Sequence, residues 1–460
     1  MSRERSGDDI QLEPPLARHA DTQPAVEDRS YIVFFAGALV MALGGGFLLA
    51  VLVSLVLSGT IDFPQDGTRL TQAHGWAQLQ GWAGLFVAGM ALRLMPRFAG
   101  RKPLPARLNV AVFVLLFSGA AVRAAAQSSG DERTAGTFIL AASLLFAAGA
   151  ATVAAALAVT FVLGRKRDEA WRYFAWAGAG WWAVWAALTI KAGVEARDHA
   201  FVPPPLDEAM TWGVMLGAIG NFVWAVQSRS VPVFFGRRPP SPRTLAVPGI
   251  ALNAGAALVV LAWLIDNDVP SVRLTSAGLA LAGIGLAWLA PVAGSAWGRA
   301  TRLRPRARAA SRYVLAANVA TVLAGLLLLT TGAASLATGE LEWAGFRDAA
   351  RHAIGLGMIT ALIFGMAQLV APVFALERAE ARAPSLVDRA AWWAIIAAIV
   401  LRVLAGLLAG DLSLEGRMHL SAAAGTLAWI AVAAFALSVF RAVRKEPAMR
   451  ELLAAPVRQS

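Results

Sequence analysis

The amino-acid sequence predicts an all-α, polytopic membrane protein with twelve transmembrane helices in three pseudo-repeats of four. Three observations predict this fold: an apolar composition, twelve apolar runs of membrane length, and a similar phrase at three places in the chain. Of the 460 residues, 58% are hydrophobic and 15% are charged, so a soluble globule would expose too much apolar surface. A lipid bilayer is therefore the expected environment.

Twelve apolar runs of about 20 residues are long enough to cross the roughly 30 Å hydrocarbon core of a bilayer. Backbone groups in that core have no water to pair with, which predicts that each run is a helix. Small residues four positions apart, as at Gly213 and Gly217 or at Gly278 and Ala282, predict close helix packing. In order, the predicted spans are 31–58, 75–96, 108–127, 135–163, 170–191, 209–228, 245–265, 273–297, 312–336, 353–374, 387–409 and 419–441.

Positive charge is distributed unevenly between the two sides of the predicted bundle. The chain has 41 Lys and Arg and a net charge of +12. Alternate loops and the C-terminal end hold 27 of these cations, against 9 on the opposite side, and this bias places both termini in the cytoplasm. The excess of basic over acidic residues is therefore explained by membrane topology, and no nucleic-acid partner is expected.

The predicted domain organisation is a single membrane domain between two tails. Residues 1–30 contain no apolar segment of a secretory signal and are expected to form a disordered cytoplasmic tail. Residues 31–441 form the twelve-helix domain, and 442–460 form a second cytoplasmic tail. The chain has no cysteine, which excludes disulfides and thiolate metal sites.

A repeated phrase predicts the internal symmetry. GMALRLMPRF at 89–98 and GMAQLVAPVF at 365–374 share five identities, and AVQSRSVPVF stands at 225–234. Pro96, Pro232 and Pro372 each begin a Pro-x-Phe, 136 and 140 residues apart. Three parallel units of four helices, at about 31–165, 170–300 and 311–441, explain this spacing. The alternative is that proline near a basic residue is a common way to end a membrane helix.

Two histidines fall at nearly equivalent positions of the first and third units. His74 precedes Pro96 by 22 residues and His352 precedes Pro372 by 20, whereas the middle unit has Met210 in this window. Imidazoles at membrane depth are usually functional. Two histidines on different helices of a bundle are the ligand set of a six-coordinate haem iron, so both are candidate metal ligands. The alternative is that each imidazole hydrogen-bonds a helix end or a loop.

Other charged residues bear on this hypothesis. Arg351 and Arg417, on the outer side, are candidates to bind haem propionates, although an arginine there can equally meet lipid phosphate. Arg402 lies inside an apolar span and should either find a partner within the bundle or extend towards the interface. Apart from Asp388, the predicted spans hold no carboxylate, which argues against a proton pump.

The second predicted helix resembles that of haem-copper oxidase subunit I, because His74-Gly75 is followed by a Gly-rich run, Pro96 and Gly100-Arg101. That resemblance implies twelve helices in three groups, with a low-spin haem between histidines of helices 2 and 10. The chain departs from it at Ala350, where the family has a second histidine, and in residues 209–265, which contain no histidine. Oxygen reduction at a binuclear centre is therefore not expected.

Over residues 31–441 the chain is also similar to the NnrS family, which is bacterial and has twelve helices. The likeness is carried by His74 and by the run from Gly89 to Phe98. It implies an inner-membrane protein with haem b, and a link to nitric oxide metabolism and nitrosative stress. The family also implies copper, but 71–76 reads TQAHGW and lacks the second histidine of the usual string, so the ligand count does not support a copper site.

Two functional hypotheses follow from the sequence. The first is a haem-binding membrane protein of the NnrS type, with an electron donor or a small gas ligand as its partner; whether it is an enzyme stays open. The second is a cofactor-free twelve-helix transporter or scaffold with the same repeat architecture. The histidine pair favours the first, since a transporter has no evident need for imidazoles at repeat-equivalent sites.

Overall fold

The computed structural model describes residues 30–63, 67–128, 131–165, 169–265, 271–293, 305–341, 343–374 and 385–444. The two predicted tails, 1–30 and 442–460, lie almost entirely outside these ranges. Within them the chain is helical and contains no strand. Ten helical runs are long and apolar enough to cross a membrane by length and composition, so the expectation of an all-α membrane protein is confirmed at this level. The runs at 67–98 and 171–195 are of comparable length.

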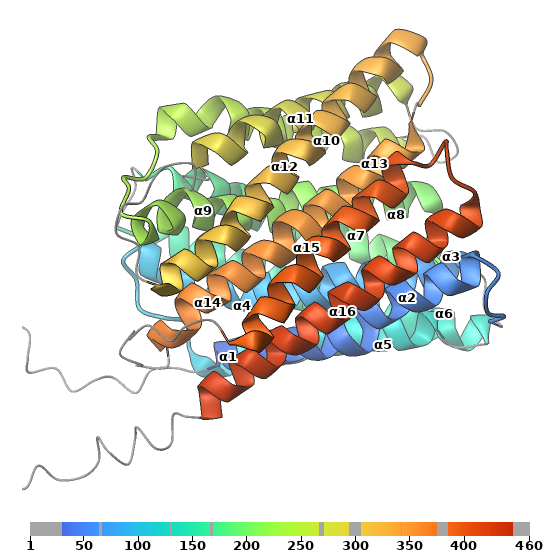
Figure 1. Cartoon of the computed structure of the whole chain (residues 1–460). Helices are drawn as coiled ribbons and strands as arrows, with labels where there is room; N and C mark the ends of the chain where they lie inside the picture. The colour runs from blue at the N-terminus through green and yellow to red at the C-terminus, as the bar shows by residue number, and fades with distance from the viewer. Residues whose placement is uncertain are drawn as a thin grey trace, which may run out of the picture.

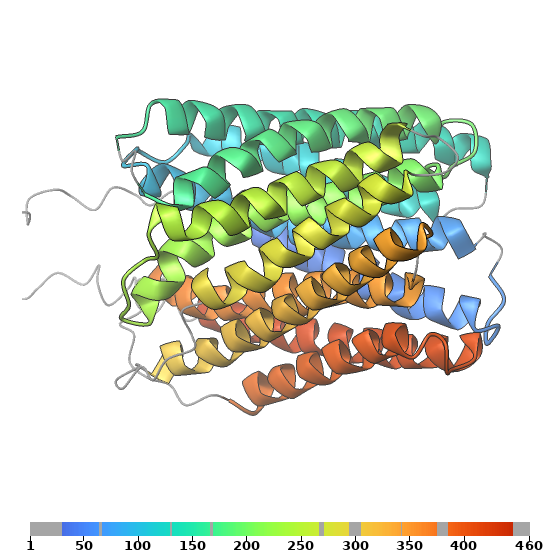
Figure 2. The same ribbon diagram turned by 90° about the horizontal axis from the view of Figure 1, so that it is seen from above.

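The described helices run back and forth as one bundle, and α1 begins at the same end at which α16 finishes (Figures 1 and 2). Their bounds, with π-helical segments marked η, are α1 (Tyr31–Met41), η1 (Ala42–Gly46), α2 (Phe47–Leu57), α3 (Gly67–Trp76), η2 (Ala77–Gly84), α4 (Leu85–Phe98), α5 (Ala106–Gln127), α6 (Glu132–Val162), α7 (Trp171–Glu195), α8 (Pro204–Trp212), η3 (Gly213–Ile219), α9 (Gly220–Phe234), α10 (Pro242–Ile265), α11 (Val272–Ala293), α12 (Pro305–Thr338), α13 (Ala344–His352), η4 (Ala353–Thr360), α14 (Ala361–Phe374), α15 (Leu386–Leu407) and α16 (Leu414–Arg444).

Three of the helical runs form the interior of the bundle. In each, a π-helical segment joins two α-helices: α3–η2–α4, α8–η3–α9 and α13–η4–α14. The segments η2, η3 and η4 begin at residues 77, 213 and 353. These starts are separated by 136 and 140 residues, the same intervals that separate the three prolines. Most side chains from the π-helix onwards are buried in all three runs, and the more exposed helices surround them.

All three interior helical runs begin earlier than the hydropathy pattern predicts, and the first starts at Gly67 where the expected span began at residue 75. The spans expected at 209–228 and 353–374 start in the structure at Pro204 and Ala344. Three carboxylates, Asp207, Glu208 and Asp348, consequently belong to helices, and the prediction that the spans hold no acid apart from Asp388 is wrong. The reason is that these residues pair with other groups of the bundle and need not be apolar, whereas a hydropathy window recognises only apolar stretches.

Glycines allow α10 and α11 to pack with their backbones in contact. A Cβ atom added to Gly255 would lie 2.4 Å from the backbone nitrogen of Ala282 and 2.6 Å from the carbonyl oxygen of Gly278. One added to Gly278 would lie 2.8 Å from the carbonyl oxygen of Gly255. In the interior, Gly217 is equally close to the indole of Trp181. The predicted packing role of the small-residue pairs is therefore confirmed.

We expect Gly255→Ala to lower the free energy of unfolding by about 1–3 kcal/mol, because the added methyl group meets backbone atoms that cannot move aside. The midpoint of thermal unfolding in detergent measures the effect. Gly180→Ala in α7 is the matched control, since a Cβ there meets nothing within 4 Å. Alanine has the higher helix propensity, so this control should be as stable as the parent or more stable. Equal destabilisation by both substitutions would contradict the packing argument.

Candidate functional site

A cavity of about 390 Å³ opens between α2, α3 and η2, α13 and η4, and α15 and α16. Both His74 and His352 line it, together with Arg351 and Arg417. The structure therefore places all four candidate site residues around one space, which is called the outer cavity below. Its volume lies within the range of about 300–1,000 Å³ that is usual for ligand pockets.

The imidazole of His74 is fixed by a backbone carbonyl of the first helical run. Its Nδ1–H donates to the carbonyl oxygen of Gly46 at 2.8 Å. Gly46 is the last residue of the π-helical segment η1, so this segment supplies an acceptor to a neighbouring helix. Because a carbonyl oxygen can only accept, the proton of the neutral ring is on Nδ1 and the lone pair is on Nε2. Metal-binding histidines commonly have this arrangement.

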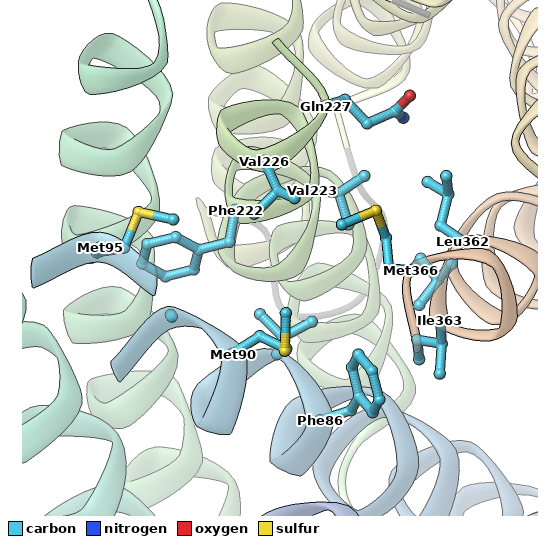
Figure 3. Close-up of a pocket in the computed structure, with 13 residues that line it drawn as sticks. Phe86, Met90, Met95, Phe222, Val223, Val226, Gln227, Leu362, Ile363 and Met366 are labelled. Atoms are coloured by element: carbon cyan, nitrogen blue, oxygen red, sulfur yellow. The ribbon is translucent and has the colours of Figure 1, made fainter. Parts of the chain in front are cut away.

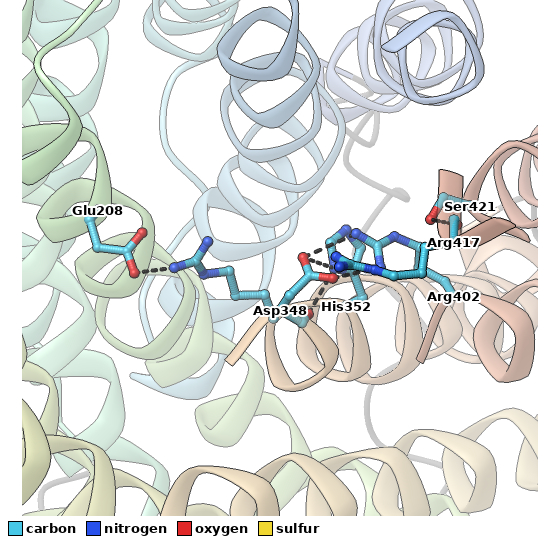
Figure 4. A network of polar contacts seen from close by, with 7 residues as sticks. Glu208, Asp348, His352, Arg402, Arg417 and Ser421 are labelled. Carbon is cyan, nitrogen blue, oxygen red and sulfur yellow. Dashed lines mark hydrogen bonds and ion pairs between the residues drawn. The ribbon is translucent and has the colours of Figure 1, made fainter. Parts of the chain in front are cut away.

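His352, the last residue of α13, is held in a similar way (Figure 4). Its Nδ1 donates to the backbone oxygen of Asp348 at 2.9 Å. The Oδ1 atom of the Asp348 carboxylate lies 3.3 Å from the same nitrogen. The hydrogen bond again leaves Nε2 as the ring nitrogen that can act as a ligand, and the adjacent carboxylate increases the electron density of the ring.

Asp348 is also bound by Arg402 of α15 through two hydrogen bonds (Figure 4). Nη1 donates to Oδ2 at 2.7 Å, and Nη2 donates to Oδ1 at 3.0 Å. Of the two roles expected for Arg402, pairing within the bundle is therefore the observed one. Sequence reasoning missed Asp348 because the predicted span began at 353. Its spacing of four residues before His352, one helical turn, is the signal that could have identified it.

The other cations of the outer cavity differ in their partners. Arg351 forms an ion pair with Glu208 of α8 and lies 5.2 Å from the ring centroid of Trp212. Its charge is therefore compensated within the protein. Arg417, near the start of α16, has a buried Nε atom without a hydrogen-bond partner, as Arg351 has, but among the described residues no ion pair is found for Arg417. Arg417 is thus the lining cation best suited to receive an anionic group from a ligand.

Two tryptophans form rigid walls of the outer cavity. Nε1 of Trp76 donates to Asp207 at 2.7 Å, and Nε1 of Trp82 donates to the hydroxyl of Thr360 at 3.1 Å. The guanidinium of Arg123, which is 1% exposed, lies 4.6 Å from the ring centroid of Trp76. These contacts fix both indole planes beside His74, as a flat aromatic ligand would require.

A second, smaller cavity of about 50 Å³ lies between the three interior helices (Figure 3). Its lining is almost entirely apolar and includes Met90, Met95 and Met366. Ile359 lines both this central cavity and the outer one, so the two spaces adjoin. The central cavity is too small for a cofactor of many atoms, whereas the outer cavity is larger and holds both histidines.

The structure refines the remaining expectations for this region. Within the described ranges, no three His, Asp or Glu side chains are grouped so as to hold a metal ion. His419 hydrogen-bonds the hydroxyl of Thr60 at 2.9 Å through Nε2. In the middle helical run, Met215 and not Met210 lines the outer cavity. Met210 precedes η3 by three residues, the same interval that separates His74 from η2, so the two positions are equivalent in the repeat although only His74 lines the cavity.

Comparison with known proteins supports the sequence resemblance. The model of the NnrS protein family matches residues 29–444. This range includes every helix described above, and with them both histidines and the outer cavity. No curated protein sequence matches the chain.

We expect Arg402→Gln to destabilise the protein by about 3 kcal/mol, because it leaves the Asp348 carboxylate buried without its partner. This is the low end of the usual range for breaking a buried pair, since the Asp348 side chain is 31% exposed. The double variant Arg402→Gln/Asp348→Asn should recover most of the loss. The midpoint of unfolding in detergent reports both changes.

The ion pair between Lys191 and Glu195, at 3.0 Å, provides the control, because its side chains are 49% and 43% exposed. Lys191→Gln should change stability by no more than about 0.5 kcal/mol. If Arg402→Gln were as mild as Lys191→Gln, the pair at Asp348 would not hold the outer cavity together.

Proposed function

The chain belongs to the NnrS family, and on that premise we propose that it is a haem-binding integral membrane protein in which His74 and His352 would hold the haem iron. One observation carries the proposal. The two imidazoles line the same cavity, and each donates Nδ1–H to a carbonyl oxygen, so each has Nε2 available as a ligand. The pair comes from the first and third interior helices, which supply one ligand each.

The donor set fits haem b in three further respects. The outer cavity combines polar and charged residues with apolar and aromatic ones that could contact a porphyrin, and hydrogen bonds hold the indoles of Trp76 and Trp82 in position. Arg417 offers a buried Nε donor that could bind a propionate. Arg351 lines the same cavity, with its charge compensated by Glu208. A haem held there would supply one-electron redox chemistry.

We propose that all the long helical runs cross the membrane, including 67–98 and 171–195, which gives twelve spans in three repeats of four. The equal intervals between the π-helical segments and between the prolines support a parallel threefold repeat. The excess of Arg and Lys at one end supports a plasma-membrane orientation with both termini in the cytoplasm.

The proposed role is in nitric oxide metabolism or the response to nitrosative stress, which the family resemblance implies. An electron donor or a small gas ligand is the expected partner of such a site. A binuclear oxygen-reducing centre is not proposed, because Ala350 stands where a second histidine would be needed and residues 209–265 contain no histidine.

The visible spectrum of the purified protein, oxidised and then reduced with dithionite, tests the ligand assignment. We expect sharp α and β bands on reduction, the signature of a six-coordinate low-spin haem. His74→Ala and His352→Ala should each remove these bands, since either substitution deletes one axial ligand.

His419→Ala is the matched control, because this histidine faces Thr60 at the same end of the bundle and should leave the bands unchanged. A colourless protein from cells supplied with haem would overturn the haem assignment. The outer cavity would then favour the transporter or scaffold hypothesis.

The charges behind His352 should tune the midpoint potential of the haem in opposite directions. Asp348→Asn removes a negative charge that stabilises the oxidised iron, so the potential should rise; Arg402→Gln removes a positive charge, so it should fall. Spectroelectrochemical titration measures both values, with Lys191→Gln as an exposed control. Shifts of the same sign in the two variants would indicate a general structural disturbance and contradict this electrostatic role.

A further inference from the structure

A third cavity, of about 520 Å³, lies at the end of the bundle opposite to the two histidines. It is bounded by the loop after α4, which contains Gly100 to Pro105, and by the last turn of α6 with the residues that follow it. Neither the proposed haem site nor the central cavity shares a lining residue with it. Its function is therefore separate from theirs.

The lining of this cavity combines positive charge with an apolar wall. Arg101, Lys102 and Arg165 are the charged residues that line it, and no carboxylate is among the described lining residues. Val159 and Leu163, at the end of α6, are 57% and 53% exposed. Because α6 is one of the apolar membrane spans, these side chains face the lipid at the level where its headgroups begin.

The loop that carries the cations is built into the bundle by specific contacts. Gly100 has a φ of +69°, a left-handed conformation that favours glycine. The backbone N–H of Arg101 donates to the carbonyl oxygen of Pro96 at 2.8 Å, and that of Arg165 donates to the carbonyl oxygen of Ala99 at 3.0 Å. The second bond joins the loop to the end of α6. The three cations are thus attached to a fixed backbone on both sides of the cavity.

We infer that this cavity binds the phosphate headgroup of an anionic phospholipid from the adjacent leaflet. Arginine and lysine are the natural donors to phosphate oxygens, and basic pockets between membrane helices at the cytoplasmic side bind anionic lipid headgroups. The exposed apolar side chains at the end of α6 would lie along the first part of an acyl chain. This wall favours a lipid over free phosphate, which would gain nothing from it.

The test compares phosphatidylglycerol, phosphatidylcholine and inorganic phosphate as ligands of the full chain in detergent. Lipid binding is measured by native mass spectrometry and by the shift of the thermal unfolding midpoint. Phosphatidylglycerol should bind and stabilise the parent protein, whereas phosphatidylcholine should do neither. The triple variant Arg101→Gln/Lys102→Gln/Arg165→Gln should bind phosphatidylglycerol more weakly by about tenfold or more, since each cation near a membrane surface adds about 1 kcal/mol of attraction.

Arg237→Gln/Arg238→Gln/Arg243→Gln is the matched control, because it removes three exposed cations before and at the start of α10, at the same end of the bundle. It should keep the affinity of the parent. Equal weakening in both triple variants would show a general charge effect and overturn the site. If millimolar inorganic phosphate displaced phosphatidylglycerol completely, the cavity would be a site for free phosphate and the lipid assignment would be overturned.

If the triple variant does not fold, Lys102→Gln and Arg165→Gln are tested singly, and each should weaken phosphatidylglycerol binding more than Arg238→Gln does. None of these measurements depends on haem. A colourless protein with the expected lipid selectivity would therefore contradict the proposed function alone.

Discussion

Hydrocarbon offers no hydrogen-bond partner, so a polar group placed inside the bundle depends on another part of the protein, or on a bound ligand, for its partner. This constraint governs the outer cavity. The carboxylate of Asp348 is held by Arg402 while its backbone oxygen accepts from His352, and Arg351 is neutralised by Glu208. Removing one member would leave a charge without compensation, and for that reason the positions of the imidazole and of the arginines depend on one another.

The π-helical segments provide acceptors that a regular α-helix would keep for itself. The carbonyl oxygen of Gly46, at the end of η1, accepts from His74, and the carbonyl oxygen of Gly355, within η4, accepts from the hydroxyl of Thr360. Thr360 in turn receives the indole N–H of Trp82. Wider helical turns of this kind are frequent at functional sites. Here their carbonyl oxygens help to position His74 and, through Thr360, the indole of Trp82 in the wall of the outer cavity.

The two ends of the bundle differ in the chemistry of their charges. At the histidine end, cations and carboxylates are paired with one another around the outer cavity, which the imidazoles of His74 and His352 line. At the other end, Arg101, Lys102 and Arg165 line a cavity whose described residues include no acid. The small, apolar central cavity lies between the two ends, among the interior helices. Paired charges fix the geometry of the proposed cofactor site, and the cations that line the third cavity are the proposed contact with an anionic lipid headgroup.

The sequence by itself determined the membrane class, the positions of the long helices, the family and the two histidines that share a cavity. The membrane class and the helices follow from local composition, because a membrane span must be apolar. The histidine pair follows from counting residues along the chain, because repeats preserve spacing. The sequence did not determine where the interior helices begin, and so Asp348, its hold on His352 and its pairing with Arg402 were missed. The contact of Asp348 with His352 lies within one helix and was missed because the predicted span began too late, whereas the contacts of His74 with Gly46 and of Asp348 with Arg402 join different helices. Only packing brings them together, since a buried charge is tolerated wherever the fold supplies its partner, and no local pattern records which partner that is.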